Sequence, residues 1–493
     1  GSGKLNEAME LYQQVIHAAS TGPLSLSIGW AWGGLGTLLL KRGQLAEAET
    51  HLMNATRLEP NTLNWWESLS EVFQLEKKLV AAEKASKQAL IIKPDSARSL
   101  YQVASVGLSL FHYSEAKDGF KKLLEIQPEY LPGKKGLAEA LLFEVRAALA
   151  DNAPEGTLEL IIQAASLAEQ CVHANKELVS LWKLHADILT FAYSLPSTVA
   201  SIEIKCKLLD QGAASFMEAF HRQSLPSFRV DYAVNRIHRY RLTADPSNRS
   251  KYLIEAETEV KQAIESDPSN SSFWNCLGII YLDKEKKKSQ HCFSKAIECD
   301  PKNLSAWNNL GALALLQNDL ELAWECFFSA QSIDHLDPSG WLGAALVMEM
   351  LESGPQVIPS YSKQALDSYE QAQELMLPRY GWLGLGFTSL VNGQFAESSF
   401  AFGVANSLAS LDLASLNALT LSFEAQGLLS NALTCIEKVV NGSSLPSVSP
   451  QQQHPVVTLA QTTETDLLAA TNTKARILCH LGRFSESLET ASK

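Results

Sequence analysis

The side chains that could do chemistry in this chain are eight cysteines, eleven histidines and one glycine-rich run. No cysteines form a Cys-x2-Cys pair. The nearest cluster, His291-Cys292 with Cys299, lacks the further ligands at short spacing that a zinc ion requires. The histidines are scattered, without an obvious acid partner in the sequence. We therefore expect the cysteines to be small core residues, and we predict no metal site, no cofactor and no catalytic residues.

The glycine-rich run Gly381-Trp382-Leu383-Gly384-Leu385-Gly386 resembles a loop that cradles phosphate. Such a loop must follow a β-strand, whereas this run lies inside a predicted helix, where small residues permit close packing. The serine-elbow, zinc-protease and Walker patterns are absent. The sequence therefore predicts a protein that is not an enzyme.

Two basic segments could bind a partner. The run Lys284 to Lys288 sits at a predicted turn, where charges are usually solvated, although contact with a protein or RNA stays open. The segment from Arg229 to Lys251 mixes arginines with aromatic residues, which is typical of protein interfaces and also suits stacking on nucleotides. The alternative is a surface helix whose arginines pair with acidic neighbours. The candidate partner-binding residues are Arg229, Tyr232, Arg236, Arg239, Tyr240 and Arg241.

The net charge of −13 is spread along the chain, which disfavours general binding to a phosphate backbone. No apolar run approaches the roughly 20 residues of a membrane helix, and no secretory signal opens the chain. We expect an intracellular, reducing environment, no membrane contact and no direct RNA contact.

These side chains must be positioned by a repeat. Pro60, Pro94 and Pro128 fall 34 residues apart, each at the end of a unit with apolar residues spaced three and four apart, as on one stripe of a helix. A small residue on each helix lets the two helices approach, and the proline ends the unit. The unit-defining residues of the first three units are Trp32, Gly36, Ala48, Pro60, Trp66, Ala82, Pro94, Ala116 and Pro128.

The same pattern returns downstream, and seven of the ten tryptophans occupy one slot of it. Its residues there are Trp182, Trp274, Gly278, Trp307, Gly311, Ala323, Trp341, Trp382 and Gly386. This is the tetratricopeptide signature. It predicts an all-α, right-handed superhelical solenoid of about twelve helix-turn-helix pairs, because one pair alone cannot bury its apolar stripe.

The repeat is uneven along the chain. We expect regular repeats at 1–130, irregular repeats with longer helices and insertions at 131–268, and repeats again at 269–440. Residues 441–463 are rich in Ser, Pro and Gln and predict a flexible loop. A truncated final repeat follows at 464–493, so the chain reads as a fragment of something longer.

Many such solenoids grip a C-terminal carboxylate with Lys and Asn on their inner helices. Asn309 offers a start, but Asn275, Ile279, Ser339 and Gly343 stand where Lys, Asn or Arg would be needed. A carboxylate clamp of this kind is therefore not expected.

Several runs resemble the scaffold subunit of the superkiller complex, a tetratricopeptide protein that assists an RNA helicase and the exosome. They are GFKKLLEIQPEYLPGKKGLAEALL from Gly119, LWKL from Leu181, FWNCLG from Phe273, and most densely 290–350. The likeness spans roughly residues 80–440 but is poor at 199–228.

The resemblance implies a non-enzymatic cytoplasmic scaffold, with the nucleus as a second compartment. It would organise a DExH-type RNA helicase and WD-repeat propeller subunits for exosome-coupled 3′-to-5′ mRNA decay. The family's propeller-binding motif, Gln-Arg-x-x-apolar, is absent, so propeller contacts are expected elsewhere in the protein. Two alternatives remain open: an adaptor of another assembly, and the substrate-binding superhelix of an enzyme without its catalytic domain.

Overall fold

The computed structural model describes residues 2–21, 28–150, 153–196, 199–352, 360–374, 379–407, 413–442 and 464–481, with 483, 486, 487 and 490 beyond them. Helices account for nearly all of the regular structure in these ranges, and no strand occurs within them. The predicted loop at 441–463 lies outside the described residues, apart from 441 and 442, which belong to a helix.

The chain divides into two compact units, 1–228 and 229–493, and each is described by itself. The helices of the first unit are α1 (Ser2–Thr21), α2 (Gly29–Arg42), α3 (Leu45–Leu58), α4 (Leu63–Leu75), α5 (Leu79–Ile92), α6 (Ala97–Ser109), α7 (Tyr113–Ile126), α8 (Leu131–Ala150), α9 (Thr157–Ala174), α10 (Val179–Phe191), the short 3-10 helix η1 (Ala192–Ser194) and α11 (Ile202–Arg222).

The second unit begins within α12. Its helices are α12 (Pro226–Leu242), α13 (Pro246–Ser266), α14 (Ser271–Tyr281), α15 (Lys286–Cys299), α16 (Leu304–Leu316), α17 (Leu320–Ile333), α18 (Pro338–Glu352), α19 (Ser360–Glu374), α20 (Arg379–Val391), α21 (Phe395–Ser407), α22 (Leu413–Ala425), α23 (Leu429–Gly442) and α24 (Glu464–His480).

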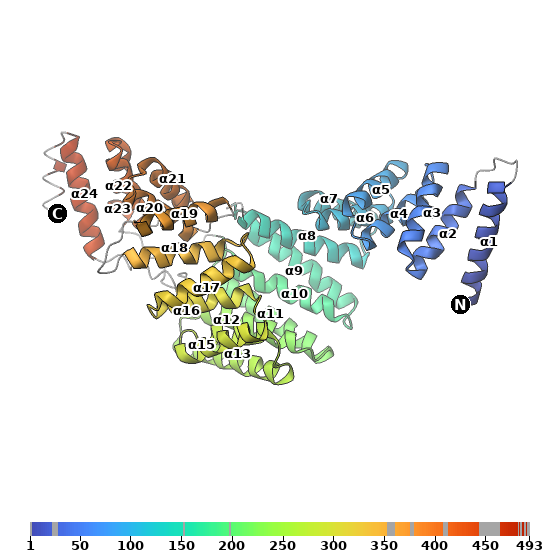
Figure 1. The fold of residues 1–493 in the computed structure, drawn as a ribbon, viewed down its shortest axis with the longest axis horizontal. Coiled ribbons are helices and arrows are strands. Elements are labelled where there is room, and N and C mark those ends of the chain that lie inside the picture. Colours follow the sequence, from blue (N-terminus) through green and yellow to red (C-terminus); the bar gives the residue numbers. More distant parts are fainter. Residues whose placement is uncertain are drawn as a thin grey trace. The chain divides into compact units, whose positions relative to one another are not determined.

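Within each unit a helix packs mainly on the helices next to it in the sequence (Figure 1). The first helices of successive pairs also touch, as α2 with α4 and α14 with α16 do. In the regular region α2 to α7 are 13 or 14 residues long. By contrast, α8, α9, α11 and α13 each have 18 to 21 residues, while α10 has 13.

A tryptophan ties each of several pairs to the turn before it. The indole Nε1–H of Trp66 donates to the carbonyl oxygen of Pro60 at 2.8 Å, and Trp274 and Trp307 do the same to Pro268 and Pro301 at 2.8 and 2.9 Å. Trp182 and Trp341 reach the carbonyl six residues earlier in the same way. Because these carbonyls lie in turns between helices, the indole supplies a partner that the helices cannot.

In three pairs, a glycine of the first helix packs against an aromatic ring of the second helix. Gly278 lies against Phe293, Gly311 against Phe327 and Gly386 against Phe402. Phe293 and Phe402 are fully buried. These three glycines thus lie where the two helices of a pair approach closely.

The turn inside several pairs contains a residue in the left-handed conformation at one slot. Gly43, with φ 82°, fills it in the pair α2–α3. The equivalent residues of the next pairs are Lys77 and Phe111, with φ 61° and 64°, and Asn318 with φ 60° serves α16–α17. This conformation costs a non-glycine residue roughly 1–2 kcal/mol. The packing of the two helices therefore outweighs the local backbone preference.

None of the helices described is long and apolar enough to cross a membrane.

We predict that Gly278→Ala destabilises the second unit. The added Cβ would overlap Cε1 of the buried Phe293, so the ring must shift. Overpacking of this kind costs about 1–3 kcal/mol in the free energy of unfolding. Urea unfolding followed by circular dichroism measures it.

Gly403→Ala is the matched control, since a Cβ there meets nothing within 4 Å on the exposed side of α21. It should stabilise the helix by about 0.5–1 kcal/mol. Equal effects of the two substitutions would contradict the packing account.

Candidate functional site

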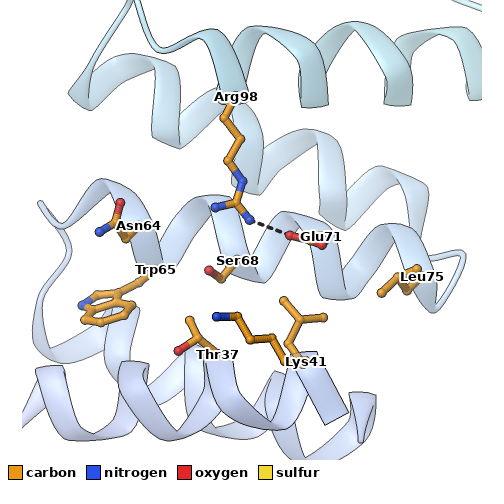
Figure 2. A pocket seen from close by; sticks show the side chains of 9 residues that line it. Thr37, Lys41, Asn64, Trp65, Ser68, Glu71, Leu75 and Arg98 are labelled. Atoms are coloured by element: carbon orange, nitrogen blue, oxygen red, sulfur yellow. Dashed lines mark hydrogen bonds and ion pairs between the residues drawn. The ribbon is translucent and has the colours of Figure 1, made fainter. Parts of the chain in front are cut away.

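A groove crosses the first helices of three successive pairs, α2, α4 and α6. It encloses about 540 Å³. Its lining residues are Thr37, Leu40, Lys41, Asn64, Trp65, Ser68, Glu71, Leu75 and Arg98, shown in Figure 2.

A buried carboxylate lies on α4, next in sequence to the groove-lining Ser68. The Glu67 side chain, on a residue only 4% exposed, accepts hydrogen bonds from Ser96 Oγ at 2.6 Å and Ser99 Oγ at 2.7 Å. Arg98 Nη1 lies 3.8 Å from its other oxygen. Because an uncompensated buried charge is costly, these partners fix the position of α6 against α4.

The rim holds two cations with different surroundings. Arg98 Nη2 binds Glu71 Oε2 at 2.5 Å, so its charge is already paired. Lys41 is exposed and makes no ion pair with any residue that the structure describes. Figure 2 shows its side chain extended along the groove toward the middle. Lys41 is therefore available to an incoming anion.

The rest of the groove offers apolar and amide surface. Leu40 and Leu75 line it beside Lys41. Trp65 lies over Gly33, and its indole N–H donates a hydrogen bond to Glu59 Oε2 at 3.1 Å. Because this donor is already used, the Trp65 ring offers the groove an apolar face. The exposed amide of Asn64 can pair with a peptide backbone. The set suits recognition of an extended chain. It contains no nucleophile paired with a base.

Sequence reasoning missed this groove, although a signal existed. Thr37 and Glu71, Lys41 and Leu75, and Asn64 and Arg98 are each 34 residues apart, the length of one repeat. The 34-residue repeat thus indicates which positions line the groove. The residue types at these positions differ from one repeat to the next, so the repeat does not predict the chemistry of the groove.

The predicted partner-binding segment lies on α12 and the start of α13, where most of its arginines have intramolecular partners. Arg229 binds Glu259 and Gln262. Arg236 is only 5% exposed and stacks on Tyr232 and Tyr252, with 5.4 Å from its guanidinium carbon to each ring centre. Arg239 lies over the ring of Tyr252, and the Tyr240 hydroxyl donates a hydrogen bond to Asp283.

Arg229 therefore behaves as the surface-helix alternative expects, while Arg236 is part of a buried cluster. Burial, aided by the charge of Arg241, lowers the pKa of the neighbouring His238 to about 4. Arg241 is half-buried. An interface on this segment stays a prediction, and its exposed cations are Arg249 and Lys251 rather than the buried Arg236.

The other sequence candidates fall into structural roles. Gly384 packs against the ring of Tyr369 inside α20, so the glycine run serves packing. In the lysine run, Lys286 Nζ donates to the carbonyl of Leu316, and Lys288 pairs with Glu285 at 2.8 Å. Asn309 donates to Asn275 at 2.9 Å.

Four cysteines are buried as expected: Cys171, Cys276, Cys292 and Cys326. Burial raises the pKa of Cys276 and Cys326 to about 12 and that of Cys292 to about 11, so these thiols stay protonated at neutral pH. Cys299 and Cys479 are exposed, contrary to the expectation of a core role.

Over the described part of the chain, Glu83, His112 and Glu115 form the one group with metal-ligand geometry. Lys87 lies 2.6 Å from Glu83 and 3.9 Å from Glu115. This ammonium already provides the positive charge there.

We predict that Arg236→Glu destabilises the second unit by about 3 kcal/mol, because it places an unpaired carboxylate at a buried position between two half-buried tyrosines. Lys251→Glu is the control, with a side chain 69% exposed, and should stay within about 0.5 kcal/mol. Thermal melts compare the two, and an unchanged melt for Arg236→Glu would contradict its structural role.

The comparisons with known proteins were consistent with this architecture. Models of the tetratricopeptide repeat match residues 34–97 and 292–325. Superkiller complex protein 3 of Homo sapiens is 29% identical over 402 residues, covering 77% of this chain and 25% of that protein.

Two further relatives extend the match. Tetratricopeptide repeat protein 37 of Xenopus laevis is 26% identical over 373 residues, covering 71% of this chain and 24% of that protein. Superkiller protein 3 of Saccharomyces cerevisiae is 22% identical over 372 residues, covering 66% and 26%. The chain thus spans about a quarter of the length of the curated relatives it matches. The predicted tetratricopeptide fold and the predicted resemblance are both confirmed.

Proposed function

We propose that this chain, a tetratricopeptide-repeat protein similar to Superkiller complex protein 3, is a non-catalytic scaffold for an assembly of the superkiller type. Its partners would be a DExH-type RNA helicase and WD-repeat propeller subunits, with the exosome joined indirectly. The proposal places the protein in the cytoplasm, with the nucleus as a second compartment. It includes no membrane contact and no direct RNA contact.

The observation that carries the proposal is the inner groove of α2, α4 and α6. A scaffold needs surfaces that hold partner segments, and this groove is concave, spans three repeats and keeps Lys41 unpaired among the described residues. The similarity to superkiller proteins over 77% of the chain supports the choice of assembly.

The chemistry of the groove favours an extended segment that carries a carboxylate next to an aliphatic side chain. The carboxylate would pair with Lys41, the aliphatic group would pack on Leu40 and Leu75, and the backbone would pair with Asn64. A basic segment is disfavoured, because it would have to compete with Arg98 for Glu71.

The assembly is tested by affinity purification of the full-length protein followed by mass spectrometry. We expect an RNA helicase and exosome components among the recovered proteins. Recovery of a different assembly would favour the adaptor alternative, and recovery with a transferase or other catalytic domain on the same polypeptide would favour the enzyme alternative.

The groove is tested separately by Lys41→Glu in the purified complex. Replacing the free cation by a carboxylate should weaken retention of the segment in the groove by about tenfold, equivalent to about 1.4 kcal/mol. The control is Lys121→Glu, an exposed lysine on α7 outside the groove. If every partner is retained equally by both variants, the groove is not the docking site, while the assembly itself can still stand.

A further inference from the structure

The outer face of α17 carries two large aromatic side chains in contact with solvent. Trp324 is 37% exposed and Phe328 is 59% exposed. They lie one helical turn apart, and their rings stack with centres 6.3 Å apart and planes 26° apart. Large aromatic surface left in water is unfavourable, and in proteins it commonly marks a contact with another molecule.

The repeat does not require these aromatics. The helix pairs can be aligned on the buried residue of the second helix, which is Phe327 in α17. In most other pairs, the two positions equivalent to Trp324 and Phe328 hold polar or small residues. Their occupants in five other pairs are Glu49 and Met53, Glu83 and Lys87, Lys117 and Lys121, Gln290 and Ser294, and Ser399 and Gly403. In one of these, Glu83 and Lys87 form an ion pair at 2.6 Å. Packing within the solenoid therefore does not explain the aromatic pair on α17.

Two carboxylates frame the aromatic pair. Glu321 and Glu325 lie on the same face of α17, within one turn of Trp324 and Phe328, and both are exposed. Neither forms an ion pair with any residue in the described part of the chain. Glu321 stands in the first turn, where the helix dipole favours a negative charge, but Glu325 lies one turn further along. The dipole therefore accounts for only one of the two.

We propose that the face formed by Glu321, Trp324, Glu325 and Phe328 docks a protein segment that is both basic and apolar. A lysine or arginine of the partner would meet the carboxylates and lay its aliphatic stem or guanidinium on the Trp324 ring, while a neighbouring aliphatic side chain covers Phe328. The carboxylates repel phosphate, so RNA and anionic lipid do not fit this face.

This surface is separate from the inner groove, and its partner is of opposite charge. The groove presents a free ammonium on first helices of the first unit, whereas the face presents two free carboxylates on a second helix of the second unit. The proposal therefore holds whether or not the assembly is of the superkiller type.

The test starts from a phage-displayed library of random twelve-residue peptides selected on the purified chain. Peptides that bind are synthesised, and their affinity is measured for three variants. Trp324→Ala with Phe328→Ala, and Glu321→Lys with Glu325→Lys, should each weaken at least one selected basic, apolar peptide about tenfold. Rising salt should weaken it further. All four residues are exposed, so circular dichroism should find the fold of both double variants unchanged.

Phe400→Ala is the matched control, because Phe400 is 61% exposed on α21, also a second helix. It should leave binding unchanged. The proposal is overturned if no selected peptide depends on Trp324 and Phe328, if the dependent peptides lack basic residues, or if Phe400→Ala weakens them equally. Binding of a uridine oligonucleotide or of phosphatidylserine vesicles that requires Trp324 would also overturn it.

Discussion

One hydrogen bond recurs through the structure, from a tryptophan indole to the carbonyl six residues before it, and it links neighbouring helix pairs at Trp66, Trp182, Trp274, Trp307 and Trp341. In α4, α14 and α16 this bond joins the start of one helix pair to the turn that ends the pair before. The ring meanwhile covers apolar surface that a smaller side chain would leave open. Each unit is therefore built from contacts between neighbours along the sequence, and this bond is one of them.

Two kinds of surface result from this arrangement. First helices of successive pairs touch, so their side chains combine into a shared inner surface, as Thr37, Ser68 and Arg98 do. Second helices present slots that meet little of their neighbours. Chemistry can change in those outer slots without disturbing the solenoid, which is why Trp324 can replace the charged residues found in other pairs.

The parts of the fold that could be predicted from sequence are those in which residue type and position recur together. Pro94, Trp307 and Gly311 do so, because the turn, the indole hydrogen bond and the close helix contact each allow few alternatives. The left-handed turn residue could not be found this way. Gly43 signals it, but Lys77 and Phe111 adopt the same conformation only because the helices on either side force it.

The candidate site was harder still to predict, for a related reason. Lys41 is recognisable as free only when its neighbours are known, and Glu67 is recognisable as buried only when Ser96 and Ser99 are placed against it. Arg236 illustrates the reverse. The sequence marks it as a surface cation, yet Tyr232 and Tyr252 enclose it once α12 and α13 pack together.

The contacts between neighbours along the sequence also determine how each unit responds to force. If two proteins docked on different pairs are pulled apart, every junction between those pairs carries the same tension, as springs do in series. Compliance then grows with the number of pairs between the two docking points, and the weakest junction yields first. A scaffold of this design is stiff over short spans and elastic over long ones.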